Sequence, residues 1–205
     1  MSDQPSVRIS KHVLREAHAC LRRGWECARR SEVHDIAVLG IFLQGNIAER
    51  VAMNDFPGVP ISGRGATAVE ATKNQLAISS QRLQQPAFEA LGVVIVPDVY
   101  EPSTARVLDV KSGKSVKEKY VLDVVISAAA VQAAGYPAEV LAITHLNPNF
   151  RADGVEPPFL TKDITSQARD LLEDYNIVDT IQRLNSDQKP EPVMTKACKG
   201  CEFAE

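Results

Sequence analysis

The sequence predicts a mixed α/β fold in one domain, and three observations carry that prediction. Residues 91–99 and 104–110 are β-branched runs separated by the turn-like sequence YEPS, which predicts a hairpin. The clearest helical pattern follows at Ser115, and residues 138–146 then form another expected strand. Helices, a hairpin, a helix and a strand in that order are typical of a mixed α/β domain.

Composition and charge narrow the function classes. The 205 residues are 44% hydrophobic and 24% charged, which is ordinary globular composition and enough for one sizeable core. The net charge of −3 excludes a globally basic nucleic-acid surface, so any such binding must come from local patches. No apolar run approaches the ~20 residues of a membrane span, and the start lacks the apolar region of a signal peptide. We therefore expect a cytoplasmic protein with no membrane partner.

The N-terminal part, residues 1–90, is expected to be mainly helical. A first helix covers 9–31, with Ser10 as its N-cap and a break at Gly24. A second helix covers about 33–54 and places five apolar residues on one stripe: Ile36, Leu39, Leu43, Ile47 and Val51. A third helix is predicted over about 66–81.

The core is expected over residues 91–184. A turn centred between Ser103 and Thr104 would set Asp98 directly opposite Asp109. The following helix begins with an S-x-x-E capping box, and Gly135 closes it. Ser115 and Glu118 form that capping box. A last helix over 165–184 leads into the linker and tail, 185–205, with its CxxC pair.

Two acids and a lysine on this hairpin suggest a catalytic site. Asp109 and Lys111 are two residues apart on a strand, so they project to the same face, and Asp98 can add a second carboxylate there. Two carboxylates and a backbone carbonyl suit Mg²⁺ or Mn²⁺. A neighbouring lysine can orient or deprotonate a water and stabilise charge that grows on a phosphate. The pattern therefore indicates phosphodiester hydrolysis, although Asp-x-Lys alone is usually a solvated edge-strand face.

The spacing P-D, eleven residues, D-x-K resembles the signature of the PD-(D/E)xK nucleases. The segments QGNIAERVAMNDFPG, PAFEALGVVIVPDVYEP, VLDVKSGKSVKEKYVLD and AAGYPAEVLAITHLNPNF are together similar to the RecB-like branch, which includes the exonucleases of CRISPR spacer acquisition. The resemblance implies a restriction-endonuclease-like core with a mixed sheet flanked by helices. It also implies metal ligation by Asp98, Asp109 and the Val110 carbonyl, with Lys111 catalytic. Its substrate would be DNA, as single strands or ends, within a nuclease or DNA-processing complex.

Some positions depart from this branch. Ser127 stands where its members usually have a glutamine, and Gly45 and Asn46 stand where a histidine is common. These departures leave a decayed nuclease that binds DNA or protein as the alternative. Glu49 and Glu89 are further candidate ligands, and Tyr120 is a candidate substrate contact, with solvated acids and core packing as the ordinary explanations.

Four cysteines suggest a second metal centre. Cys198 and Cys201 form a C-x-x-C hook, a spacing that lets two sulfurs reach one metal or cluster. Cys20 lies in a segment similar to the N-terminal cysteine segment of the same nuclease branch, which implies a [4Fe-4S] cluster that joins the two ends of the chain. Cys27 is the remaining candidate, although in an unbroken helix it would lie about 10.5 Å along the axis from Cys20. Structural Zn²⁺ remains the alternative.

Basic residues gather in two stretches. The first stretch lies around the expected start of the core helix and consists of Lys114, Lys117 and Lys119. The second stretch includes Arg22 and Arg23. Such runs are usually solvated faces, but beside a metal site they would serve as a track for the DNA backbone. Three hypotheses follow: a metal-dependent DNA nuclease with a cluster as staple, a binding module on the same fold, and a plain α/β domain with structural zinc.

Overall fold

A six-stranded mixed sheet forms the centre of the computed structural model, which describes residues 7–30, 36–195, 198–199 and 201–203. The strand order is β1-β2-β5-β6-β7-β8, with β1–β2 and β6–β7 parallel and the other neighbours antiparallel. A separate antiparallel ribbon consists of β3 (Phe88–Ala90) and β4 (Val93–Ile95). The strands of the main sheet are β1 (Val59–Pro60), β2 (Leu83–Gln84), β5 (Val99–Glu101), β6 (Arg106–Lys111), β7 (Val140–Leu146) and β8 (Phe159–Asp163).

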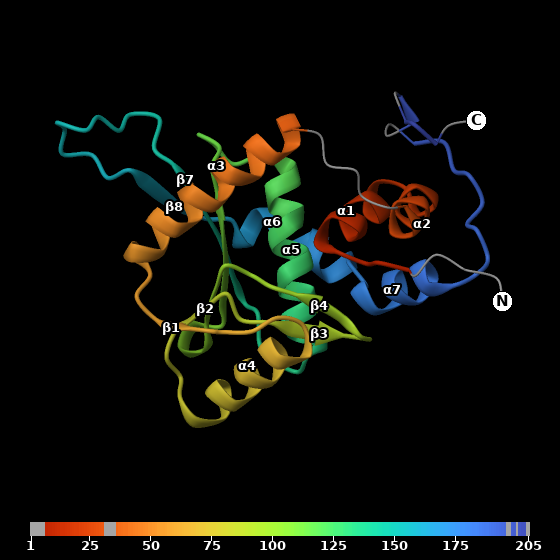
Figure 1. Cartoon of the computed structure of the whole chain (residues 1–205), viewed down its shortest axis with the longest axis horizontal. Helices are drawn as coiled ribbons and strands as arrows, with labels where there is room; N and C mark the ends of the chain where they lie inside the picture. The colour runs from red at the N-terminus through yellow and green to blue at the C-terminus, as the bar shows by residue number, and fades with distance from the viewer. Residues whose placement is uncertain (1–6, 31–35, 196–197, 200, 204–205) are drawn as a thin grey trace.

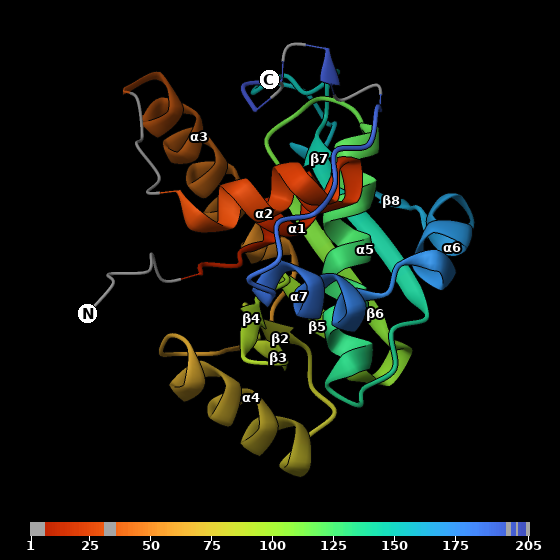
Figure 2. The same ribbon diagram turned by 90° about the vertical axis from the view of Figure 1, so that its right-hand side faces the viewer.

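Helices cover both faces of this sheet (Figure 1). One face carries α5 (Glu118–Ala133), which joins β6 to β7, together with α1 (Lys11–Ala19), α2 (Leu21–Arg29), α6 (Thr165–Asp174) and α7 (Ile177–Asn185). The other face carries α3 (Ile36–Ala52), which Figure 2 shows set apart from that group. The remaining elements are α4 (Ala66–Ile78) and the short 3₁₀ turns η1 (Met53–Asp55) and η2 (Pro102–Thr104). In the described parts of the chain, no helix is long and apolar enough to cross a bilayer.

Strand β6 separates two hydrophobic clusters. Val107 packs in the larger cluster with α5, whereas Leu108 and Val110 pack in the smaller one with α3. Because successive strand residues point to opposite faces, Asp109 and Lys111 lie on the α5 side with Val107. The sequence prediction that these two share a face is confirmed.

The predicted hairpin is partly correct. The pairing Val99–Leu108, Tyr100–Val107 and Glu101–Arg106 has the expected register, and one more step along it sets Asp98 opposite Asp109. The expected strand 91–99 is wrong as one element, since β4 belongs to the ribbon and only β5 pairs with β6. Pro97 lies between them and has no N–H to give to a ladder, which is a physical reason for the interruption.

Several helix ends follow the sequence and others do not. The Ser10 side chain caps α1 by accepting from Val13 N at 3.3 Å, and Gly135, with φ +88°, ends α5. The Ser115 capping box is wrong, because α5 begins at Glu118 and its N-cap makes no side-chain hydrogen bond. The expected helix over 165–184 is two helices, and the Asn176 side chain caps the second of them. The N-terminal part also holds β1, β2 and β3 beside its helices.

The break in the first helix falls at Cys20, not at Gly24 as the sequence predicts. Cys20 is extended, with φ −164° and ψ 116°, and separates α1 from α2. Gly24 is buried inside α2, where an added Cβ would lie 2.4 Å from the Ala17 Cβ. The glycine therefore permits the close contact of the two helices.

We expect Gly24→Val to lower the free energy of unfolding by about 2 kcal/mol, because the new side chain would overlap the backbone of α1. Urea denaturation of the purified chain measures this. Gly45→Ala is the matched control, since nothing lies within 4 Å of that added Cβ, and in a helix the change should stabilise by up to ~1 kcal/mol. Equal effects of the two substitutions would contradict a role in packing.

One face of α3 is apolar and exposed. Three residues of the predicted stripe, Leu43, Ile47 and Val51, have exposed fractions of 63%, 63% and 47%. The side chains of the other two, Ile36 and Leu39, lie outside those that the structure describes. Ala48 and Ala52 face the sheet instead. The small residues allow close packing on β6, and the large ones point outward.

Candidate functional site

Three acidic and basic side chains meet where β6 passes under the first turns of α5. The Lys111 Nζ donates to Asp109 Oδ2 at 3.1 Å and to Asp123 Oδ2 at 3.0 Å. Asp109 is 1% exposed, and Asp123 is 6% exposed. The alternation of β6 and the second turn of α5 thus bring two carboxylates onto one ammonium.

Helix α1 adds two more cations from the far end of the sequence. The Lys11 Nζ donates to Asp109 Oδ2 at 3.1 Å, and Arg15 Nη1 donates to Asp123 Oδ1 at 3.1 Å. The two residues are four apart, so they lie on the same face of the helix. Each buried acid is therefore contacted by Lys111 and by one cation of α1.

Asp98 lies next to this group, one residue before β5. Its Oδ2 accepts from Val110 N at 2.5 Å. Because the N–H and C=O of one strand residue point to the same edge, the Val110 carbonyl lies on the side of Asp98. The structure thus places Asp98, Asp109, Val110 and Lys111 together, as the sequence predicts.

The charges of this group shift the pKa of its members. Burial, followed by the negative charges of Asp109 and Glu49, raises the pKa of Asp98 to about 7. Burial disfavours ionised Asp109, but Lys11 and Lys111 outweigh it and lower that pKa. Burial also acts against protonated Lys111, yet the carboxylates of Asp109, Asp123 and Asp98 raise its pKa. Lys111 therefore stays protonated at neutral pH and acts as a hydrogen-bond donor.

The carboxylates of Asp98 and Asp109 are the kind of oxygen donors that a divalent cation binds. Asp109 Oδ1 is buried and has no hydrogen-bond partner among the residues that the structure describes. Burial is the main cause of the raised pKa of Asp98, and the charge of Asp109 adds to it; a cation between the two carboxylates would offset that repulsion. In the described residues no three His, Cys, Asp or Glu side chains gather as a metal-binding group, so a ligand set would rely on two carboxylates and the Val110 carbonyl.

The two additional candidate ligands have different outcomes. Glu49 of α3 accepts a hydrogen bond from Gln85 Nε2 at 2.5 Å, and its charge acts on Asp98, so it borders the site. Glu89 does not join the site, which corrects the sequence prediction. It is exposed on the β3–β4 ribbon and lines a cavity with Lys73 and Tyr136, near the opposite end of α5.

Three lysine side chains lie close to the ring of Tyr120 at the start of α5. The Nζ atoms of Lys111, Lys117 and Lys119 lie 5.7, 5.8 and 5.5 Å from the centre of its ring. Lys114, Lys117 and Lys119 are exposed. Two lysines of the expected basic cluster, Lys117 and Lys119, thus lie around an aromatic side chain beside Lys111.

The other predicted contacts are placed elsewhere. Ser127 is fully buried one turn beyond Asp123, and its Oγ donates to the Asp123 carbonyl at 3.1 Å, so it does not reach the surface. Arg23 Nε lies 2.6 Å from Glu16 Oε2, and Arg22 lines a cavity with Cys20. These arginines belong to α2 and not to the lysine cluster.

Sequence reasoning did not place Lys11 or Asp123 at this site, and it assigned Arg15 only to the second basic stretch. Asp123 is the one charged residue between Tyr120 and Ala133, and a lone acid in an apolar helix was a usable signal. Lys11 lies 98 residues from Asp109 in the chain, so no local sequence pattern predicts their contact.

The cysteines divide between two places. Cys20 lines a cavity of about 580 Å³ with Val193 and Thr195, and the Thr195 N–H donates to Cys198 Sγ at 3.3 Å. Cys27 lines a different cavity, and burial, with the charge of Glu16, raises its pKa. The chain after Cys201 is tied to the end of α2 by Arg30 and Glu202, 2.7 Å apart.

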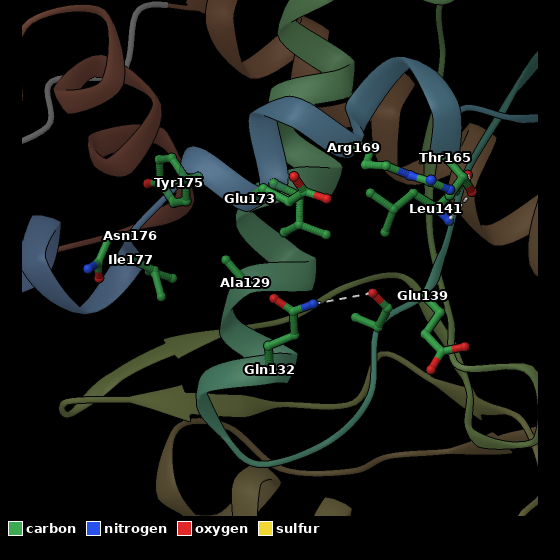
Figure 3. A pocket seen from close by; sticks show the side chains of 12 residues that line it. Ala129, Gln132, Glu139, Leu141, Thr165, Arg169, Glu173, Tyr175, Asn176 and Ile177 are labelled. Carbon is green, nitrogen blue, oxygen red and sulfur yellow. Dashed lines mark hydrogen bonds between the residues drawn. The ribbon is translucent and has the colours of Figure 1, made fainter.

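A separate cavity of about 580 Å³ lies between the last turns of α5, β7 and α6 (Figure 3). Arg169 and Thr165 of α6 line it together with two acids, Glu139 and Glu173. Two carboxylates beside one guanidinium do not favour a phosphate. None of Asp98, Asp109, Lys111 and Asp123 lines this cavity, so it is separate from the site that they form.

We expect Asp98→Asn to stabilise the metal-free protein at alkaline pH. A carboxyl whose pKa rises from 3.8 to about 7 on folding costs nothing below its ordinary pKa, and its cost grows until the pH exceeds the folded value. The variant keeps an acceptor for Val110 N, so its gain should be about 4 kcal/mol at pH 8.5 and near zero at pH 4. Urea denaturation in EDTA measures it, with Asp153→Asn in an exposed loop as control. A gain independent of pH would contradict the assignment.

No protein-family model matches this chain, and the comparison with curated proteins finds no similar sequence. Function is therefore inferred from the geometry of the acids and the lysine.

Proposed function

We propose that the protein is a Mg²⁺- or Mn²⁺-dependent DNA nuclease of the RecB-like, PD-(D/E)xK type. The observation that supports it is the register of β5 and β6, which sets Asp98 beside Asp109 while Lys111 shares the face of Asp109. That arrangement offers two carboxylates, one carbonyl and one ammonium at a single place. It is the donor set that metal-assisted phosphodiester hydrolysis requires.

Each residue has a definite part in this proposal. Asp98, Asp109 and the Val110 carbonyl would hold the cation, which would supply Lewis-acid activation of an attacking water and offset charge on the phosphate. Lys111 has three N–H donors, and Asp109 and Asp123 accept two of them. The third is available to a phosphate oxygen or to the water. Because the pKa of Lys111 is raised, we assign it charge stabilisation and not proton abstraction.

The lysine cluster supplies a place for the DNA backbone. Lys117 and Lys119 are exposed around Tyr120 at the N-terminus of α5, where the helix dipole also favours a phosphate, and Lys114 is exposed in the preceding connection. An aromatic ring within a cationic patch suits an unpaired base and its phosphate. Single strands or DNA ends are therefore the proposed substrates.

An iron–sulfur cluster is the proposed staple of the two ends of the chain. Cys20 lies at the α1–α2 junction, and residues that share its cavity contact Cys198. Cys201 follows in the same turn of chain, with its N–H donating to the Cys198 carbonyl. Protein purified without oxygen should absorb near 400 nm, and Cys20→Ser should remove that band. A colourless wild-type preparation would overturn the cluster and leave zinc to be tested by metal analysis.

One observation favours the alternative of a catalytically decayed binding module. Asp109 is 1% exposed, and both Lys11 and Lys111 contact its Oδ2. A buried, neutralised acid can hold a fold together without binding a metal. DNA binding that persists without any cleavage would identify this module.

The deciding experiment incubates the purified chain with end-labelled single-stranded and duplex DNA in Mn²⁺, in Mg²⁺ and in EDTA. The nuclease proposal expects cleavage with either cation and none with EDTA, and loss of cleavage in Asp98→Ala and Asp109→Ala. Wild-type protein that cleaves neither DNA substrate with either cation would refute it.

A further inference from the structure

Two ammonium groups share one oxygen of the central acid. Lys11 and Lys111 both lie 3.1 Å from Asp109 Oδ2, while Asp109 Oδ1 has no hydrogen-bond partner in the described parts of the chain. An ammonium is a compact point charge, so two of them on one oxygen supply about as much positive charge as one divalent ion. A cation that bound the same carboxylate would meet repulsion from both.

The two lysines differ in what else holds them. Lys111 also donates to Asp123 at 3.0 Å, and its side chain is 17% exposed. Within the described residues, Asp109 is the one hydrogen-bond partner of Lys11, whose side chain is 25% exposed. If Asp109 turned to a cation, Lys111 would keep a carboxylate, whereas Lys11 would lose its partner and could extend into solvent.

We propose that Lys11 is a displaceable internal cation: it neutralises Asp109 while the divalent site is empty and leaves that oxygen when the metal binds. This inference rests on the proposed metal site and adds a competitor to it. It gives α1 a definite role, since the N-cap at Ser10 fixes the first turn and presents Lys11 to the sheet. The competition lowers the affinity of the site for metal and keeps the empty site stable.

The test is a calorimetric titration of the full chain with Mn²⁺ in the absence of DNA, for wild type, Lys11→Met and Arg15→Met. Lys11→Met keeps an apolar stem and removes the charge, so its Kd for Mn²⁺ should fall about tenfold. Arg15→Met is the matched control, because it removes a cation from the same face of α1 that contacts Asp123 and not Asp109. Its Kd should change less than about twofold, since the charge lies farther from the metal.

Other outcomes are equally informative. A wild type that binds Mn²⁺ with a Kd unchanged or raised in Lys11→Met overturns the competition but leaves the metal site in place. An equal gain in both variants also overturns it, because that result would reflect net charge alone. Absence of Mn²⁺ binding in every variant overturns the metal site and this inference with it. If Lys11→Met does not fold, Lys11→Gln, which retains a donor for Asp109 without the charge, gives the same comparison.

Discussion

Replacing Lys111 by methionine is expected to lower the rate of Mn²⁺-dependent DNA cleavage by about 10²–10³. Methionine keeps much of the aliphatic stem but removes the ammonium that lies 3.1 Å from Asp109 and 3.0 Å from Asp123. Charge that develops on the phosphate would then lack its nearest donor. The measurement is single-turnover cleavage of a labelled single strand at saturating Mn²⁺.

Lys114→Met is the control for this prediction. Lys114 is exposed in the same connection between β6 and α5, and it is not among the lysines around Tyr120. Its loss should weaken DNA binding a few-fold and leave the single-turnover rate within about twofold of wild type. If the two variants lose the same rate, Lys111 contributes only to general attraction of DNA.

Asp109→Asn is expected to weaken Mn²⁺ binding by at least about 100-fold, which corresponds to ~2.7 kcal/mol. The change removes one of two carboxylates while the side chain keeps its shape. The fold should tolerate it, because Lys111 retains Asp123 and the repulsion on Asp98 falls. Thermal unfolding with and without Mn²⁺ measures the effect, since a bound ligand stabilises the folded state.

Asp163→Asn tests whether the loss is specific. Asp163 is an exposed aspartate on β8 of the same sheet, and its Oδ1 accepts from Thr165 N at 2.8 Å, which asparagine can also do. This variant should keep the full Mn²⁺-induced rise in Tm. A rise that survives in Asp109→Asn would place any bound cation somewhere other than beside β6.

The part of the site that lies on the hairpin follows from the sequence. The turn between Ser103 and Thr104 fixes the register, and the two-residue period then determines which faces Asp98, Asp109 and Lys111 occupy. Local turn geometry and strand alternation are enough for this. The strand limits were not predictable in the same way, because Pro97 interrupts a continuous apolar run that reads as one strand.

The part of the site that α1 contributes could not be predicted from local sequence patterns. Lys11 and Arg15 reach the acids only because α1 packs across α5, and no spacing between residues so far apart encodes that contact. The break between α1 and α2 was predicted at the wrong residue for a related reason. A glycine in a helix reads as a weak point, whereas Gly24 is required by the nearness of Ala17, which only the tertiary structure reveals.

Strand β6 is hydrogen-bonded to a neighbour along both of its edges, to β5 on one side and along its full length to β7 on the other. The outer strands β1 and β2 pair over only two residues each. Amide hydrogens of such short strands exchange with solvent through local opening, whereas those of a central strand exchange only when the whole domain unfolds. Asp109 and Lys111 therefore belong to the most persistent unit of the fold, and a chain loosened at its β1 edge still holds them in register.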